Sequence, residues 1–122
     1  MDIREQTSAS DGSRTIYVLH IPANVDAEQI LEMAEELDPL VEASSPRHAL
    51  YLVANVSDLA FINSTGIGYF IKVQRALSIR GGEIVIAEPS AFFRTVIDTL
   101  GLESTFRLFD RESDAIAACD TA

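Results

Sequence analysis

The chain has 122 residues, of which 48% are hydrophobic and 23% charged; this predicts one folded domain over residues 1–122 and excludes a disordered or fibrous protein. Its single cysteine excludes a disulfide framework, and its net charge of −10 repels nucleic acid and anionic membranes, so we expect neither as a partner. No apolar run is long enough to cross a bilayer and the N-terminal stretch is polar, so we expect a cytoplasmic protein.

The first elements in chain order are two strands joined by a turn. A short strand is expected near residues 3–7 and a stronger one over 14–21, with small and polar turn residues between them at 8–13. Both faces of the second strand carry apolar side chains, which is typical of a strand inside a sheet.

A helix and a central strand follow. Asp26 is a plausible N-cap, and apolar residues recur at helical spacing from Ile30 to Val41. A loop at 44–47 then leads into the nearly continuous apolar run 48–56, which predicts a buried central strand.

The second half of the chain repeats the alternation of helix and strand. The predicted elements are a helix with apolar positions from Ile67 to Leu77 that ends at Gly81–Gly82, a strand at 83–87, a helix from Phe92 to Leu100 that ends at Gly101, a strand at 105–109 and a helix at 113–119. This order predicts an α/β fold: a mixed, mostly parallel sheet of four or five strands with a hairpin at its start, flanked by about four helices.

Charge is unevenly distributed along the chain. From Asp26 to Glu42 there are seven acids and no base, whereas from Ser64 to Arg80 there are three bases and no acid. Solvated helix faces explain both segments. A second interpretation is that the basic segment docks an acidic patch elsewhere.

Few residues offer catalytic or metal chemistry. Neither His20 nor His48 has a second ligand at metal spacing, so we expect no catalytic residue, no metal and no cofactor. Before Ser64-Thr65-Gly66 a strand runs into a loop, and a hydroxyl then opens a helix; local chemistry favours Ser64 as the N-cap of that helix. A catalytic serine would need a base that the sequence does not offer, whereas a phosphoacceptor needs only exposure because the kinase brings the base, metal and nucleotide.

The stretch SDLAFINSTGIGYF, residues 57–70, resembles the signature of STAS domains of the anti-sigma-factor antagonist type. These domains read apolar-aromatic-apolar and then Asp-Ser-Ser/Thr-Gly-Leu/Val-Gly. The Gly81-Gly82 turn before the EIVIA strand and the Thr99-Leu100-Gly101-Leu102 corner are similar too. The resemblance covers about residues 14–117 and implies the small STAS sheet with flanking helices.

The resemblance also implies a function without catalysis. Such a protein binds an anti-sigma factor that is also a serine kinase of the histidine-kinase-like ATPase type, and a serine phosphatase reverses the phosphorylation. The phosphoacceptor maps onto Ser64, with Thr65 a lesser candidate, and we expect a monomer. The implied partner-binding residues are Asp26, Asn63, Ser64, Thr65, Gly66, Ile67 and Gly68.

Two departures from the family pattern keep an alternative open. Asn63 replaces the motif Asp, and the early Gly-Glu-Ile/Leu-Asp stretch is absent, so that only Asp26 corresponds to it. The alternative is a STAS interaction module that is not phosphorylated, such as a transporter accessory subunit or a signalling scaffold.

Overall fold

The computed structural model describes residues 1–6 and 13–121, so the turn predicted at 8–13 lies largely outside the described residues. Its main element is a sheet of five strands in the order β1-β2-β4-β6-β7. The strands are β1 (Asp2–Gln6), β2 (Arg14–His20), β4 (Ala49–Asn55), β6 (Glu83–Ala87) and β7 (Leu108–Phe109). β1 pairs with β2 antiparallel and the other pairs are parallel, which confirms the predicted mixed sheet with a hairpin at its start.

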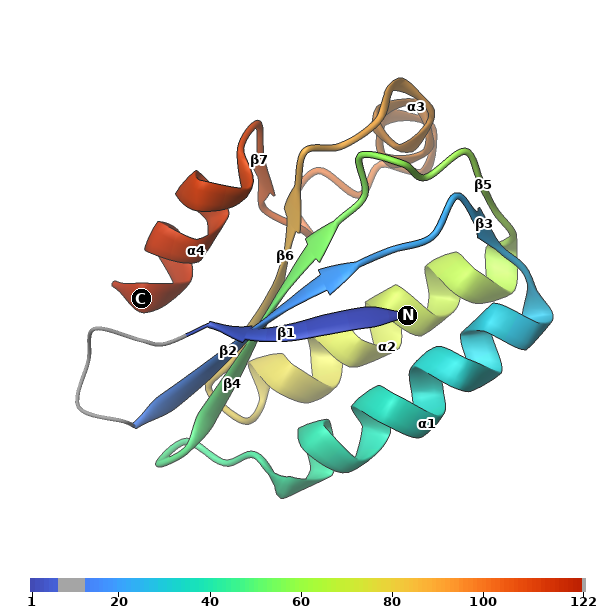
Figure 1. The fold of residues 1–122 in the computed structure, drawn as a ribbon. Helices are drawn as coiled ribbons and strands as arrows, with labels where there is room; N and C mark the ends of the chain where they lie inside the picture. Colours follow the sequence, from blue (N-terminus) through green and yellow to red (C-terminus); the bar gives the residue numbers. More distant parts are fainter. Residues whose placement is uncertain (7–12, 122) are drawn as a thin grey trace.

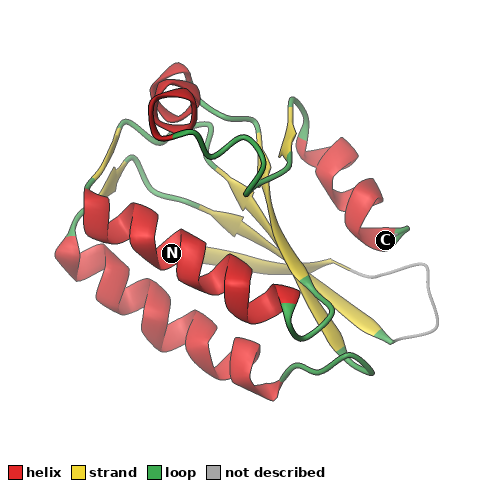
Figure 2. Cartoon of the chain, turned by 180° about the vertical axis from the view of Figure 1, so that it is seen from behind, coloured by secondary structure: helices red, strands yellow, loops and turns green. Residues whose placement is uncertain are grey.

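Helices cover both faces of this sheet (Figure 1). They are α1 (Ala27–Ala43), α2 (Ser64–Ser78), α3 (Ala91–Leu100) and α4 (Glu112–Asp120). α1 and α2 lie side by side on one face and α4 lies on the other, while α3 sits beyond the carboxyl ends of the strands (Figures 1 and 2). The fold is thus the α/β arrangement expected from the order of the elements.

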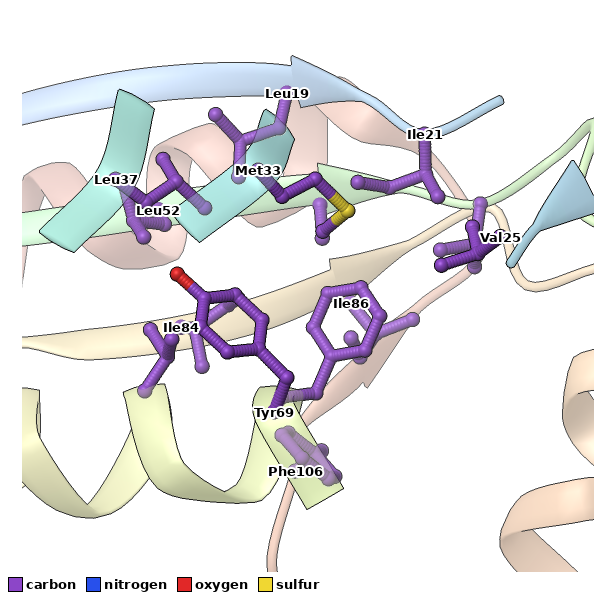
Figure 3. Packing of buried hydrophobic residues seen from close by; sticks show 14 of the residues in the cluster. Leu19, Ile21, Val25, Met33, Leu37, Leu52, Tyr69, Ile84, Ile86 and Phe106 are labelled. Atoms are coloured by element: carbon purple, nitrogen blue, oxygen red, sulfur yellow. The ribbon is translucent and has the colours of Figure 1, made fainter. Parts of the chain in front are cut away.

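β4 lies at the centre of the sheet, and all seven of its residues are buried. Leu50, Leu52 and Ala54 belong to the larger core under α1 and α2, part of which Figure 3 shows. The alternate residues Ala49, Tyr51 and Val53 belong to a smaller core under α4. Because successive side chains of a strand point to opposite faces, an apolar run of this length requires cover on both sides, as the sequence predicted.

For the predicted elements, the structure differs from the sequence-based boundaries by more than one residue at two places. α2 ends at Ser78 rather than at the glycine pair, although Gly81 does take a positive φ of 80° in the turn that follows. The last strand shrinks from 105–109 to Leu108–Phe109, because Thr105 and Phe106 donate backbone hydrogen bonds to the Leu102 carbonyl.

In the described part of the chain, no helix is both long and apolar enough to cross a membrane.

Candidate functional site

Two very short strands that the sequence analysis missed position the candidate site. β3 (Asn24–Val25) and β5 (Phe61–Ile62) form a separate parallel pair, with Val25 opposite Ile62. The Ala23 carbonyl holds the pair in place by accepting hydrogen bonds from the Ala60 and Phe61 N–H groups at 2.8 and 2.9 Å. Since the strands are parallel and in register, α1 and α2 start side by side at the same end of this pair (Figure 1).

The N-cap of α2 is Asn63, so the prediction that Ser64 caps this helix is wrong. The Asn63 backbone is extended, and its Oδ1 accepts a hydrogen bond from the Gly66 N–H at 2.8 Å. Both residue types make good caps, and the choice between them depends on where the chain leaves the strand. Pairing of β5 ends at Ile62, which places Asn63 at the cap and Ser64 in the first turn.

Ser64 and Thr65 present two exposed hydroxyl groups at this helix start. Within the described residues neither hydroxyl makes a hydrogen bond. The first turn of α2 contains no acidic residue. Its N-terminal backbone amides and helix dipole therefore favour a negative charge placed nearby.

The two glycines of the motif have different surroundings. A Cβ on Gly66 would lie 2.6 Å from Ile62 Cγ1, so tight packing inside the chain explains this glycine. A Cβ on Gly68 would meet nothing within 4 Å. Gly66 and Ile67 are buried while Gly68 is exposed, so of these three only Gly68 presents its backbone broadly to solvent.

Asp26, the remaining sequence-predicted residue, is the N-cap of α1. Its Oδ1 accepts a hydrogen bond from the Gln29 N–H at 3.0 Å. Asp26 follows Val25 as Asn63 follows Ile62, so the register of β3 and β5 brings the two caps to neighbouring positions. The structure thus gathers all seven predicted residues at one end of the α1–α2 layer.

An apolar groove of about 300 Å³ runs from Ser64 to α3. Its lining residues are Ile62, Asn63, Ser64 and Ile67 from the β5–α2 corner, and Phe92, Thr95, Val96, Thr99 and Leu100 from α3. The sequence analysis missed the α3 side. The helical periodicity predicted an amphipathic helix with Phe92, Val96 and Leu100 among its apolar residues, and Leu100 is 55% exposed.

A part-buried hydrogen bond fixes the second turn of α2 against α1. The Tyr69 hydroxyl donates to Asp38 Oδ1 at 2.8 Å. Burial of the hydroxyl raises the pKa of Tyr69 far above its ordinary value of 10.0, and the bond to the Asp38 carboxylate raises it further. Figure 3 shows Tyr69 extending from α2 into the apolar layer that contains Met33 and Leu37. This bond holds the start of α2 in a defined position.

The histidines do not build a second site. His20 Nε2 lies 2.7 Å from Asp58 Oδ2, and both side chains are largely exposed. Among the described residues no group of three or more His, Cys, Asp or Glu side chains could hold a metal ion.

The hydroxyl-bearing strand–helix corner lies on a small mixed sheet with two helices on one face. The model of the STAS domain family matches residues 8–115. The chain belongs to the STAS family and is similar to anti-sigma factor antagonists, which are generally non-enzymatic regulators.

Three proteins are similar to the chain, one in sequence and two in fold. The chain is 24% identical over 75 residues to an anti-sigma F factor antagonist of Paenibacillus polymyxa, an alignment that covers 62% of this chain and 64% of that protein. The Bacillus cell fate determinant SpoIIAA in its phosphorylated form has a TM-score of 0.67 at 17% identity, with coverage of 96% and 98%. The murine anion transporter Slc26a9 has a TM-score of 0.69 at 15% identity, with coverage of 91% of this chain and 18% of the transporter.

Proposed function

We propose that this protein is an anti-sigma-factor antagonist in a cytoplasmic partner-switching pathway. It binds an anti-sigma factor that is also a serine kinase of the histidine-kinase-like ATPase type, and so releases the sigma factor. Phosphorylation of Ser64 ends the binding and a serine phosphatase restores it. Membership of the STAS family and the likeness to an anti-sigma F factor antagonist support this proposal.

The exposed hydroxyl of Ser64 is the observation that carries the proposal. Asn63 occupies the cap, so the Ser64 oxygen has no structural task in the described residues and can be modified without breaking an internal bond. A kinase supplies the catalytic base, the metal and the nucleotide, so the acceptor needs only exposure and a fixed position. A helix start held by β5 pairing and by Tyr69 provides that fixed position.

The phosphate would act on the interface rather than on the fold. It adds about −1.5 to −2 charges. At the first turn of α2 these charges face free amides and the positive end of the helix dipole, so the fold tolerates them. In a protein contact the same charges must be desolvated and meet partner acids, and each loss of about 1.4 kcal/mol lowers affinity about tenfold.

The proposed contact surface centres on the exposed residues Ser64, Thr65 and Gly68. Ile67 contributes through the apolar groove that it shares with α3. Asn63 and Asp26 flank this surface as the two adjacent caps. A phosphate on Ser64 would thus stand at the mouth of the groove, where a docked partner side chain would be desolvated.

The test is incubation of the full chain with ATP and each histidine-kinase-like anti-sigma factor encoded in the source genome. We expect one kinase to add the mass of a single phosphate, which peptide mapping assigns to Ser64. Ser64→Ala should keep binding and lose the modification, Thr65→Ala should keep both, and Ser64→Asp should bind at least about tenfold more weakly. Binding by Ser64→Asp at wild-type affinity, or no modification by any kinase, would contradict the proposal.

Asn63 favours one alternative, a STAS interaction module that is not phosphorylated. Its amide keeps the cap that the motif Asp would form but removes the carboxylate next to the acceptor. The STAS fold also occurs within the Slc26a9 anion transporter. Asn63→Asp separates the two functions: the antagonist should be phosphorylated by its kinase with either residue, whereas the module should co-purify with a transporter subunit and accept no phosphate.

A further inference from the structure

A line of exposed residues runs along α2 away from the candidate phosphorylation site. Ser64, Gly68, Lys72, Arg75 and Ile79 recur every three or four residues, and all five are exposed; we refer to them as the α2 ridge. Helical geometry places such residues on one face, and at 1.5 Å per residue the ridge is about 22 Å long. Ile79, just past the last helical residue, is 78% exposed, which is unusual for an isoleucine.

Gly68 is the first sign that this face meets another molecule. An exposed glycine inside a helix costs about 1 kcal/mol relative to alanine. Gly66 has a reason within the chain, because a Cβ there would collide with Ile62. Gly68 has none: it does not take a positive φ, and a Cβ would enter open space. A missing side chain at this place lets the backbone of a second helix come close to α2.

Charge is the second sign. Residues 64–80 contain no acid, and among the described residues neither Lys72 nor Arg75 forms an ion pair. Lys72 borders a shallow groove of about 130 Å³ with Asp38 and Glu42 of α1, while Arg75 does not line it. In a chain of net charge −10, the ridge is a cationic line on an acidic molecule. Such a line attracts an acidic partner and is screened by salt.

We propose that the α2 ridge docks an acidic helix of a partner protein, which crosses α2 at Gly68 and places carboxylates against Lys72 and Arg75. The far end of the partner helix packs on Ile79. This inference rests on the proposed function only for its regulation: a phosphate on Ser64, at the near end of the ridge, would repel the same carboxylates. The negative charge of the phosphate would thus drive the acidic helix off the ridge, and this repulsion would be the physical basis of the switch.

The test is an NMR titration of the full ¹⁵N-labelled chain with a synthetic amphipathic helical peptide that carries glutamates along one edge. A peptide of the same sequence with glutamine in place of glutamate is the matched control. We expect amide shifts at Gly68, Lys72 and Arg75 with the acidic peptide, weakened by added salt, and none with the control. No shifts, or equal shifts with both peptides, would overturn the proposed charge complementarity.

Charge-reversal variants locate the binding. The double variant Lys72→Glu/Arg75→Glu should bind the acidic peptide about tenfold or more weakly, because two attractions become repulsions. Arg111→Glu is the matched control: Arg111 is exposed, forms no ion pair in the described residues, and precedes α4 on the other face of the sheet. Equal weakening by both variants would show a response to net charge alone and would overturn the ridge as a site.

Glycine variants test the close approach. Gly68→Ala and Gly68→Gln should both raise the melting temperature, since the new side chains enter open space, and should bind the peptide progressively more weakly. Unchanged peptide affinity in Gly68→Gln would exclude a crossing at Gly68.

None of these peptide measurements uses the anti-sigma factor, so a failed kinase assay would leave their results valid. Conversely, phosphorylation of Ser64 without peptide binding at the ridge would refute this inference alone.

Discussion

The starts of α1 and α2 are near copies of each other with different surfaces. Each follows a two-residue strand, β3 or β5, and each cap accepts a hydrogen bond from the N–H three residues on, at 3.0 Å for Asp26 and 2.8 Å for Asn63. In both helices the fourth residue after the cap, Ile30 or Ile67, is a buried isoleucine. The fifth is exposed, but it is Leu31 in α1 and Gly68 in α2.

Charge is where the two helix starts diverge. α1 already has carboxylates at its positive end, from the cap Asp26 and from Glu28 in the first turn. α2 has a neutral cap and hydroxyls in that place, with no acid in its first turn. One backbone arrangement can thus satisfy its helix dipole with permanent carboxylates, as in α1, or leave it available to a removable charge, as in α2.

The largest expected effect comes from replacing Gly66, the tightly packed glycine at the start of α2. Gly66→Ala should lower the free energy of unfolding by about 1–3 kcal/mol, because its Cβ would lie 2.6 Å from Ile62 Cγ1 in a packed corner. Urea denaturation measures the change, and Gly68→Ala, whose Cβ meets nothing, is the matched control. Wild-type stability in Gly66→Ala would mean that the corner can relax around the extra methyl group.

Loss of the hydrogen bond from Tyr69 to Asp38, which joins α2 to α1, should have the next largest effect. Tyr69→Phe should lower the free energy of unfolding by about 1–2 kcal/mol at neutral pH, because it leaves the Asp38 carboxylate without its hydroxyl donor. The folded-state pKa of Tyr69 lies above the ordinary value of 10.0, so the stability that the hydroxyl contributes is complete below about pH 10. It is lost as the pH rises further. The difference in free energy of unfolding between the wild type and Tyr69→Phe, measured by urea denaturation, should therefore shrink above that pH. A difference that stays constant would contradict the stabilising role of the Tyr69 hydroxyl.

Removing the two caps tests their equivalence. Asp26→Ala and Asn63→Ala should each lower the free energy of unfolding by about 1 kcal/mol, since each leaves one helix N–H without its acceptor. Thermal unfolding of the two variants and the wild type provides the measurement. A cost for Asn63→Ala well below that for Asp26→Ala would indicate that Ser64 replaces Asn63 as the cap.

The smallest expected effect comes from placing a permanent negative charge at Ser64, in the first turn of α2. Ser64→Asp should stabilise the fold by about 0.3–1 kcal/mol at low salt, because it places a carboxylate at a helix start that has none. Ala27→Asp, the matching position in α1, should gain less because Asp26 and Glu28 already lie beside it. Ser64→Asn controls for shape. Destabilisation by Ser64→Asp would contradict the view that α2 accepts a phosphate without strain.

The residues that the sequence singled out lie together in the structure, but the cap among them was assigned wrongly. The apolar periodicities of β4, α1 and α3 predicted these elements closely, because each pattern repeats over several turns or alternations. β3 and β5 were missed, since two residues carry no detectable period. Without β5 nothing in the sequence chooses between Asn63 and Ser64 as the cap, as both side chains accept the same backbone N–H. The α3 side of the groove was missed for a similar reason, because periodicity cannot tell a core position from a groove lining.

The sequence by itself determined the order of the four helices and of the strands in the main sheet, the segregation of acid on α1 from base on α2, and the hydroxyls at the strand–helix corner. These features depend on local patterning and on residue identity. Only the tertiary structure decided that Ser64 is exposed and is not the N-cap of α2. It also decided that Asp26 lies beside Asn63, and that Gly66 is tightly packed while Gly68 borders open space. Each of these depends on a contact between segments distant in the chain, and local periodicity does not encode such contacts.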